Sequence, residues 1–267
     1  MTGRIPARAG KLAAALLATA AVLAVMAGGA SASGTVIYND IPSPLPGNVP
    51  SQAFEATSTS EAGSEVQFAG ASAATTKVSV ALSSWACESG GAEDGSCVTA
   101  AGAKFEWPVT LHIYTVGLGN TVGTQIASLT RTFKMPYRPS ANATKCPGNG
   151  GWYRAGSCFH GKLFKIAFVL KGVSLPSQAI ISVAYNTSDF GAEPQRSKTP
   201  AGGPYDSLNL GLTGTPTVGS QPQPEDAYLN STWTGAYCDN GLTGTGTFRL
   251  DAGCWAGDQP LFKVETG

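Results

Sequence analysis

The chain has 267 residues with 17 basic and 17 acidic side chains, and charged residues make up only 13% of it. Because Lys and Arg form no cluster, we expect no nucleic acid and no anionic lipid as a partner. The 34 Gly and 17 Pro, together with many Ser and Thr, are typical of extracellular proteins built from short strands and turns.

Residues 1–32 have the three parts of a secretory signal peptide. A basic start is followed by the apolar run Leu12 to Met26 and by the cleavage motif Ala30-Ser31-Ala32. The apolar run is short for a transmembrane helix, which takes about 20 residues. We therefore expect cleavage after Ala32 and no membrane insertion afterwards. The mature protein would be secreted, either extracellular or loosely associated with the cell surface.

Alternation of apolar and polar residues predicts a series of short strands, and no helical period of useful length follows the signal peptide. The predicted strands are Thr35 to Tyr38, Phe54 to Thr57, Glu65 to Phe68, Thr76 to Leu82, Val109 to Val116, Gln125 to Phe133, Lys162 to Leu170, Gln178 to Asn186, Ser207 to Leu212, Ala227 to Leu229, Gly246 to Leu250 and Leu261 to Val264.

The stretch from Lys162 to Asn186 has the strongest pattern. Phe164, Ile166, Phe168 and Leu170 share one parity, so they lie on one face of a strand. Such a face needs a second sheet to cover it. We therefore predict an all-β fold, an antiparallel two-sheet β-sandwich that is jelly-roll-like and carries disulfide-bounded loops, as a single domain over residues 33–267.

Two segments are largely irregular. Residues 33–53 begin with the predicted strand Thr35 to Tyr38 and continue with four prolines, which cannot donate to a sheet ladder, alternating with Ile41, Leu45 and Val49. We expect this segment to lie extended against the sandwich. The polar run from Thr187 to Pro204 predicts a surface excursion.

Six cysteines follow the signal peptide, and an even number in an exported chain favours disulfides over metal ligands or catalytic thiols. Sequence alone permits fifteen pairings. Each consecutive pair, however, brackets a Gly-rich turn, so we predict disulfides between Cys87 and Cys97, Cys146 and Cys158, and Cys238 and Cys254.

Three segments resemble parts of uncharacterised secreted bacterial sandwich proteins: Ile37 to Ser51 (IYNDIPSPLPGNVPS), Pro204 to Asn209 (PYDSLN) and Gly246 to Trp255 (GTFRLDAGCW). Some proteins of that group carry a C-terminal surface-sorting segment, which is absent here. The shared motifs are structural turns. The resemblance therefore implies architecture and export and supplies no catalytic residue.

Motifs for catalysis and cofactor binding are absent from the mature chain. It has no Gly-x-Ser-x-Gly elbow, no His-Glu-x-x-His, no P-loop and no Gly-x-Gly-x-x-Gly fingerprint. Two histidines and six paired cysteines leave few ligands for a catalytic zinc. His112, inside a strand, is more typical of a packed or surface residue, while His160 lies near the aromatic run after Gly151. We expect no cofactor and no metal.

Pairs of carboxylates could hydrolyse a glycoside, one as acid and the other as nucleophile or base. By residue type the candidates are Glu225 with Asp226, Asp189 with Glu193, and Asp239 with Asp251. Solvated loop carboxylates are the simpler interpretation, and no Asp-x-Asp-x-Asp spacing supports a calcium site.

Aromatic residues gather in or near the Cys-bounded loops. An indole or phenol ring can stack on the C–H face of a sugar, and disulfides would hold the ring rigid, which lowers the ordering cost of binding. The alternative is that these rings pack over sheet edges and disulfides. The candidate ligand-binding residues are Trp152, Tyr153, Trp233, Tyr237 and Trp255.

These patterns lead to three hypotheses of different classes. The first is a non-catalytic secreted or surface-associated sandwich that binds an extracellular ligand, with a glycan or a cell-surface component as partner. The second is a structural envelope or matrix protein without a small ligand. The third is a carbohydrate-active hydrolase that uses loop carboxylates.

Overall fold

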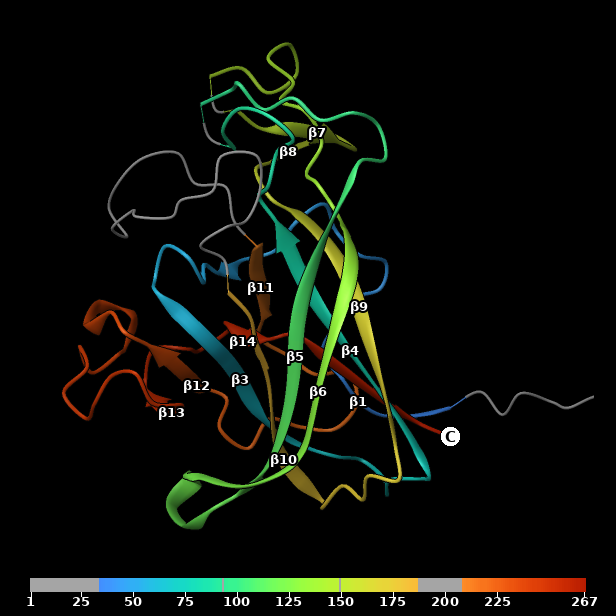
Figure 1. Ribbon diagram of the computed structural model, residues 1–267, viewed down its shortest axis with the longest axis vertical. Coiled ribbons are helices and arrows are strands. Elements are labelled where there is room, and N and C mark those ends of the chain that lie inside the picture. The colour runs from blue at the N-terminus through green and yellow to red at the C-terminus, as the bar shows by residue number, and fades with distance from the viewer. Residues whose placement is uncertain (1–33, 93, 149, 187–207) are drawn as a thin grey trace, which may run out of the picture. The chain divides into compact units, whose positions relative to one another are not determined.

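The computed structural model describes residues 34–92, 94–148, 150–186 and 208–267 (Figure 1). The predicted signal peptide and the predicted excursion from Thr187 to Pro204 lie outside these residues. The described residues form β-strands and two short 3-10 helices, η1 (Leu118–Asn120) and η2 (Thr234–Ala236). Neither helix has the length or apolar character needed to cross a membrane.

The first sheet is organised around β4 (Thr75–Ser84). One edge of β4 pairs over its whole length with β9 (Lys162–Lys171). The other edge is shared, since β15 (Phe262–Thr266) pairs with its first half and β11 (Leu208–Thr213) with its end. The remaining strands are β1 (Thr35–Asn39), which pairs with β15, and β2 (Ser51–Gln52) and β14 (Gln259–Pro260), which both pair with β11.

The second sheet has six strands in the order β13-β12-β3-β10-β5-β6. Every pairing in both sheets is antiparallel, and β5 and β6 form a hairpin. The bounds are β3 (Thr59–Gln67), β5 (Lys104–Val116), β6 (Val122–Pro136), β10 (Gln178–Ala184), β12 (Asp226–Ser231) and β13 (Arg249–Ala252). A separate small hairpin consists of β7 (Trp152–Arg154) and β8 (Ser157–Phe159).

The two sheets pack face to face through one apolar core, which confirms the predicted all-β antiparallel architecture with its three disulfides. Phe164, Ile166, Phe168 and Leu170 of β9 are all buried in this core, as their shared parity predicts. The rings of Phe168 in the first sheet and Phe133 in the second lie 5.0 Å apart, edge to face. Jelly-roll connectivity stays a prediction.

The two strands of the stretch from Lys162 to Asn186 lie in different sheets. β9 pairs with β4 in the first sheet, whereas β10 pairs with β3 and β5 in the second. The connection between them therefore crosses from one sheet to the other (Figure 1). This crossing places the apolar residues of both strands on opposite sides of the same core.

One predicted strand, Phe54 to Thr57, is wrong. These residues form a turn closed by hydrogen bonds from Thr57 N to Ala53 O at 3.0 Å and from Thr59 N to Phe54 O at 2.8 Å. The apolar Phe54 is buried because its ring stacks on Tyr185, with ring centroids 4.1 Å apart. A single anchored aromatic residue in a turn gives the same local signal as a short strand.

The Pro-rich segment covers the outer face of the first sheet. Ile41, Leu45 and Val49 pack with Ala81 of β4, Leu163 of β9 and Leu261. Ala81 and Leu163 have the opposite parity to the core residues of their strands, so this second apolar cluster lies on the far side of the sheet.

Asp40 is a buried carboxyl that joins three segments. Its Oδ1 accepts a hydrogen bond from Phe262 N at 2.6 Å, and its Oδ2 lies 2.8 Å from the Tyr38 hydroxyl and 3.3 Å from Gln221 Nε2. Gln221 Oε1 is buried and has no hydrogen-bond partner among the described residues. Burial raises the pKa of Asp40 to about 8. A rotated Gln221 amide would let Oε1 accept the proton of the neutral carboxyl.

We expect Asp40→Asn to flatten the dependence of stability on pH. The pKa of Asp40 is higher in the folded protein than in the unfolded chain, where it is about 3.9. Asp40 therefore makes its full contribution to the free energy of unfolding below pH ~3.9, and this contribution is lost as the pH rises through about 8. The neutral Asn keeps an acceptor for Phe262 N and cannot ionise. The free energy of unfolding of the wild type, measured in urea, should fall by a few kcal/mol between mildly acidic and mildly basic pH, and that of the variant should fall much less.

Asp258→Asn provides the control for this experiment, because Asp258 lies in a surface turn and is partly exposed. Its profile should follow that of the wild type. Parallel profiles for the wild type and Asp40→Asn would contradict the assignment of the titration to Asp40.

Candidate functional site

Four strand ends meet at one end of the sandwich. β4 ends at Ser84 opposite Lys162 of β9, and β5 begins at Lys104 opposite Pro136 of β6. The connecting segments 85–103 and 137–161 therefore gather at this end, around the β7–β8 hairpin (Figure 1). We call these two segments the loop cap.

Each segment of the loop cap is closed by its own disulfide, and all three disulfides pair as predicted. Their Cα atoms are 5.6 to 5.7 Å apart. The bonds are Cys87–Cys97 and Cys146–Cys158 in the loop cap, and Cys238–Cys254 in the segment that follows β12.

Hydrogen bonds join the two segments of the loop cap to each other. Ala141 N donates to Cys97 O at 3.0 Å, and Arg138 N donates to Ala86 O at 2.9 Å. The Ser140 hydroxyl accepts from Thr99 N at 2.9 Å and lies 3.1 Å from Thr99 O. The cap is therefore cross-linked both within and between its segments.

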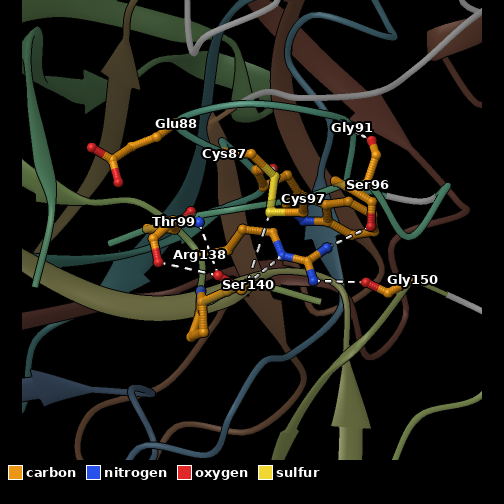
Figure 2. The surroundings of a disulfide bond; sticks show 12 residues. Cys87, Glu88, Gly91, Ser96, Cys97, Thr99, Arg138, Ser140 and Gly150 are labelled. Carbon is orange, nitrogen blue, oxygen red and sulfur yellow. Dashed lines mark hydrogen bonds between the residues drawn. A yellow bond between two sulfur atoms is a disulfide. The ribbon is translucent and has the colours of Figure 1, made fainter. Parts of the chain in front are cut away.

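Arg138 is a fully buried guanidinium at the centre of the loop cap. Figure 2 shows it beside the Cys87–Cys97 disulfide, pointing between the two segments. Nη2 donates to Gly150 O at 2.7 Å, Nε donates to Pro139 O at 3.1 Å, and Nη1 donates to Ala92 O. One side chain thus donates to backbone carbonyls of both segments. These charge-assisted hydrogen bonds offset the large cost of removing the guanidinium from water.

Two of the predicted ligand-binding aromatics lie in the β7–β8 hairpin. Trp152 is buried, its Nε1 donates to Gly161 O at 2.8 Å, and its ring packs against Phe159 with centroids 5.3 Å apart. Its neighbour Tyr153 is 37% exposed, and the Lys145 Nζ lies 4.5 Å from the centroid of its ring. Consecutive strand residues face opposite ways, so only Tyr153 reaches solvent.

The other three predicted aromatics lie around the Cys238–Cys254 disulfide. The buried Tyr237 hydroxyl bonds to the backbone of Ser231, and the buried Trp255 donates from Nε1 to Asp251 at 2.8 Å. Trp233 is 39% exposed. Figure 1 places the end of β12 well away from the β7–β8 hairpin, so the five aromatics do not form one platform.

Asp226, Asp239 and Asp251 each accept hydrogen bonds from neighbouring backbone or side-chain groups. Hydrogen bonds from Thr243 and Arg249 lower the pKa of Asp239. Burial raises the pKa of Asp251, whose oxygens accept from Cys238 N and Trp255 Nε1. The carboxylate of Asp226 accepts from Gly253 N at 2.9 Å. Asp189 and Glu193 lie outside the described residues.

The described residues contain one group with potential metal ligands close together, formed by Cys238, Asp251 and Cys254. The two sulfurs are bonded to each other in a disulfide. They are therefore not available as the thiolates that a metal would need.

Sequence reasoning missed a polar cluster on the outer face of the second sheet. Glu61 Oε1 lies 2.5 Å from Ser182 Oγ, 2.8 Å from His112 Nδ1 and 3.0 Å from the Tyr114 hydroxyl. These are the residue types of a hydrolytic triad. The serine, however, contacts the carboxylate and not the imidazole, so the Ser-His-acid order of such a triad is not formed among these residues. The cluster instead cross-links β3, β5 and β10.

The signal in the sequence was the shared outward parity of His112 and Tyr114 in β5. This signal was insufficient, because only the strand register brings Glu61 and Ser182 beside them. The cluster also depends on Gly63. A Cβ at this position would lie 2.2 Å from Ile181 O and 2.6 Å from Ser182 Cβ. Burial and the charge of Glu61 raise the pKa of the Tyr114 hydroxyl, which stays protonated.

Two clefts open in the loop cap. The first has a volume of about 350 Å³ and is lined mainly by small residues: Asp94, Gly95, Ala141, Ala143, Cys146, Gly148 and Gly150. The second has a volume of about 340 Å³ and lies between residues 99–104, residues 136–140 and Lys162. Burial, and then the nearby positive charges of Arg154 and Lys104, lower the pKa of Lys162.

Comparison with known proteins leaves the loop cap to be interpreted from its own geometry. No family model, no curated protein and no solved structure matches the chain.

We expect Arg138→Lys to destabilise the protein by about 2–3 kcal/mol, because a lysine cannot reach carbonyls on both segments at once. Urea unfolding would measure the loss, and limited proteolysis would show cleavage within the loop cap. Arg131→Lys is the matched control, since Arg131 is exposed on β6. Equal stability of the two variants would contradict a structural role for the Arg138 guanidinium.

Proposed function

We propose that the protein is a non-catalytic, secreted or cell-surface β-sandwich that binds an extracellular glycan through the loop cap. The observation that carries this proposal is the construction of the cap. Two disulfides, one buried guanidinium and direct hydrogen bonds between the segments hold its clefts in one conformation. A preformed site loses little conformational entropy when a ligand binds.

Tyr153 supplies the stacking surface in this proposal. Its ring is partly exposed on the β7–β8 hairpin of the cap, and the Lys145 ammonium covers one ring face. A sugar would stack on the opposite face through its C–H groups. The three disulfides support an extracellular setting, because disulfides persist in oxidising compartments.

A second candidate is a structural envelope or matrix protein whose surface serves assembly. Leu118 at the β5–β6 turn is 97% exposed, and Leu242 in the Cys238–Cys254 loop is 87% exposed. Isolated exposed leucines are common. Concentration-dependent self-association that is abolished by Leu118→Asp or Leu242→Asp would favour assembly over glycan binding.

We expect the exported protein to bind a subset of glycans on an array, and Tyr153→Ala to weaken that binding by about tenfold through the loss of stacking. Affinities for the array hits would be measured by calorimetry. Trp233→Ala is the matched control, because it removes an aromatic ring of similar exposure near the other disulfide loop.

Binding to no glycan would overturn the proposed function. Binding that is sensitive to Trp233→Ala but not to Tyr153→Ala would keep a glycan ligand and overturn its location at the loop cap.

A further inference from the structure

Two lysines line the second cleft from two different strands. Lys104 is the first residue of β5, and Lys162 is the first residue of β9. Arg154 of the β7–β8 hairpin adds a third positive charge near Lys162. Among the described residues, neither lysine forms an ion pair with a carboxylate, in contrast to Lys77 and Lys263, which both bond to Glu265.

Two acidic side chains on the segments around the cleft have partners of their own. Glu88 Oε2 accepts a hydrogen bond from the backbone N–H of Ala100, which lines the cleft. Glu106 of β5 pairs with Lys134 of β6, with 3.6 Å between Oε1 and Nζ. The charged side chains in the lining of the cleft are Lys104 and Lys162, so the lining itself is positive.

The rest of the cleft suits a saccharide. Pro136, Pro139 and Tyr137 form its apolar wall, and the Tyr137 ring packs against Phe105 with centroids 5.0 Å apart. Ser140 supplies a polar group to the lining, and its hydroxyl is held in place by hydrogen bonds with the backbone of Thr99. An apolar wall with a few fixed polar groups is the usual composition of a small-ligand site.

We infer that this cleft binds the anionic group of an acidic saccharide, with Lys104 and Lys162 contacting its oxygens and the Pro136–Pro139 wall contacting the sugar ring. The anionic group would be a uronate carboxylate or a sulfate ester, since an ammonium binds either as a point charge. The inference rests on the proposed glycan-binding function and specifies its substrate class.

The test measures binding of three hexasaccharides to the exported protein by calorimetry: oligogalacturonate, a heparin fragment and cellohexaose. We expect one of the two acidic probes to bind, with affinity that falls as salt rises, and cellohexaose to bind much more weakly. Lys104→Met with Lys162→Met should reduce the affinity for the acidic probe about tenfold. If the double variant does not fold, Lys162→Gln alone should reduce it about threefold.

Lys165→Met with Lys171→Met is the matched control, because both lysines are exposed on β9 and the change in net charge is the same. Equal effects of the two double variants would overturn the inference, since general charge attraction would then explain the binding. Tight, salt-independent binding of cellohexaose would also overturn it, while the glycan-binding function would stand.

Galacturonate and sulfate alone provide a readout that does not depend on glycan binding. Chemical shift changes of Lys104 and Lys162 with either anion, in a protein that binds no hexasaccharide, would support the anion cleft and refute the glycan function. No shift change together with no hexasaccharide binding would refute both.

Discussion

Hydrogen bonding along both edges of β4 is the constraint on which the rest of the structure depends. One edge is paired along its whole length by β9, and the other is divided between β15 and β11. The inner face of β4 contributes Val78, Val80 and Leu82 to the core, and its outer face lies under the Pro-rich segment. Its end delivers the chain to Cys87 and thereby fixes where the loop cap stands.

Most of the fold could be predicted from the alternation of apolar and polar residues and from turn residues, because a strand that is buried on one face has an apolar side chain at every second position. The strands around Val78, Leu111 and Phe168 follow this rule, and the consecutive pairing of cysteines follows from the short turns that they bracket. The predicted strand from Phe54 to Thr57 is wrong because one buried aromatic residue in a turn gives the same local sequence pattern as a short strand. The assignment of β9 and β10 to different sheets depends on long-range strand pairing, which local sequence patterns do not determine.

The functional region was harder to predict, because exposure is decided by neighbours that are distant in sequence. Trp152 and Tyr153 are adjacent, yet one donates into the protein and the other lies beside Lys145 in solvent. The polar cluster of Glu61, His112, Tyr114 and Ser182 draws on three strands. The second cleft brings Lys104 and Lys162 together from strand starts 58 positions apart.

Each disulfide joins cysteines that are neighbours in the order of the chain, at separations of 10, 12 and 16 residues. A chain that enters an oxidising compartment with its N-terminus first can close each bond before the next pair arrives. The correct partner is then the first one available, and few of the fifteen possible pairings compete. No disulfide links the two sheets or two different loops. Each covalent closure is therefore local to one loop, and the two segments of the loop cap are joined to each other by hydrogen bonds rather than by a disulfide.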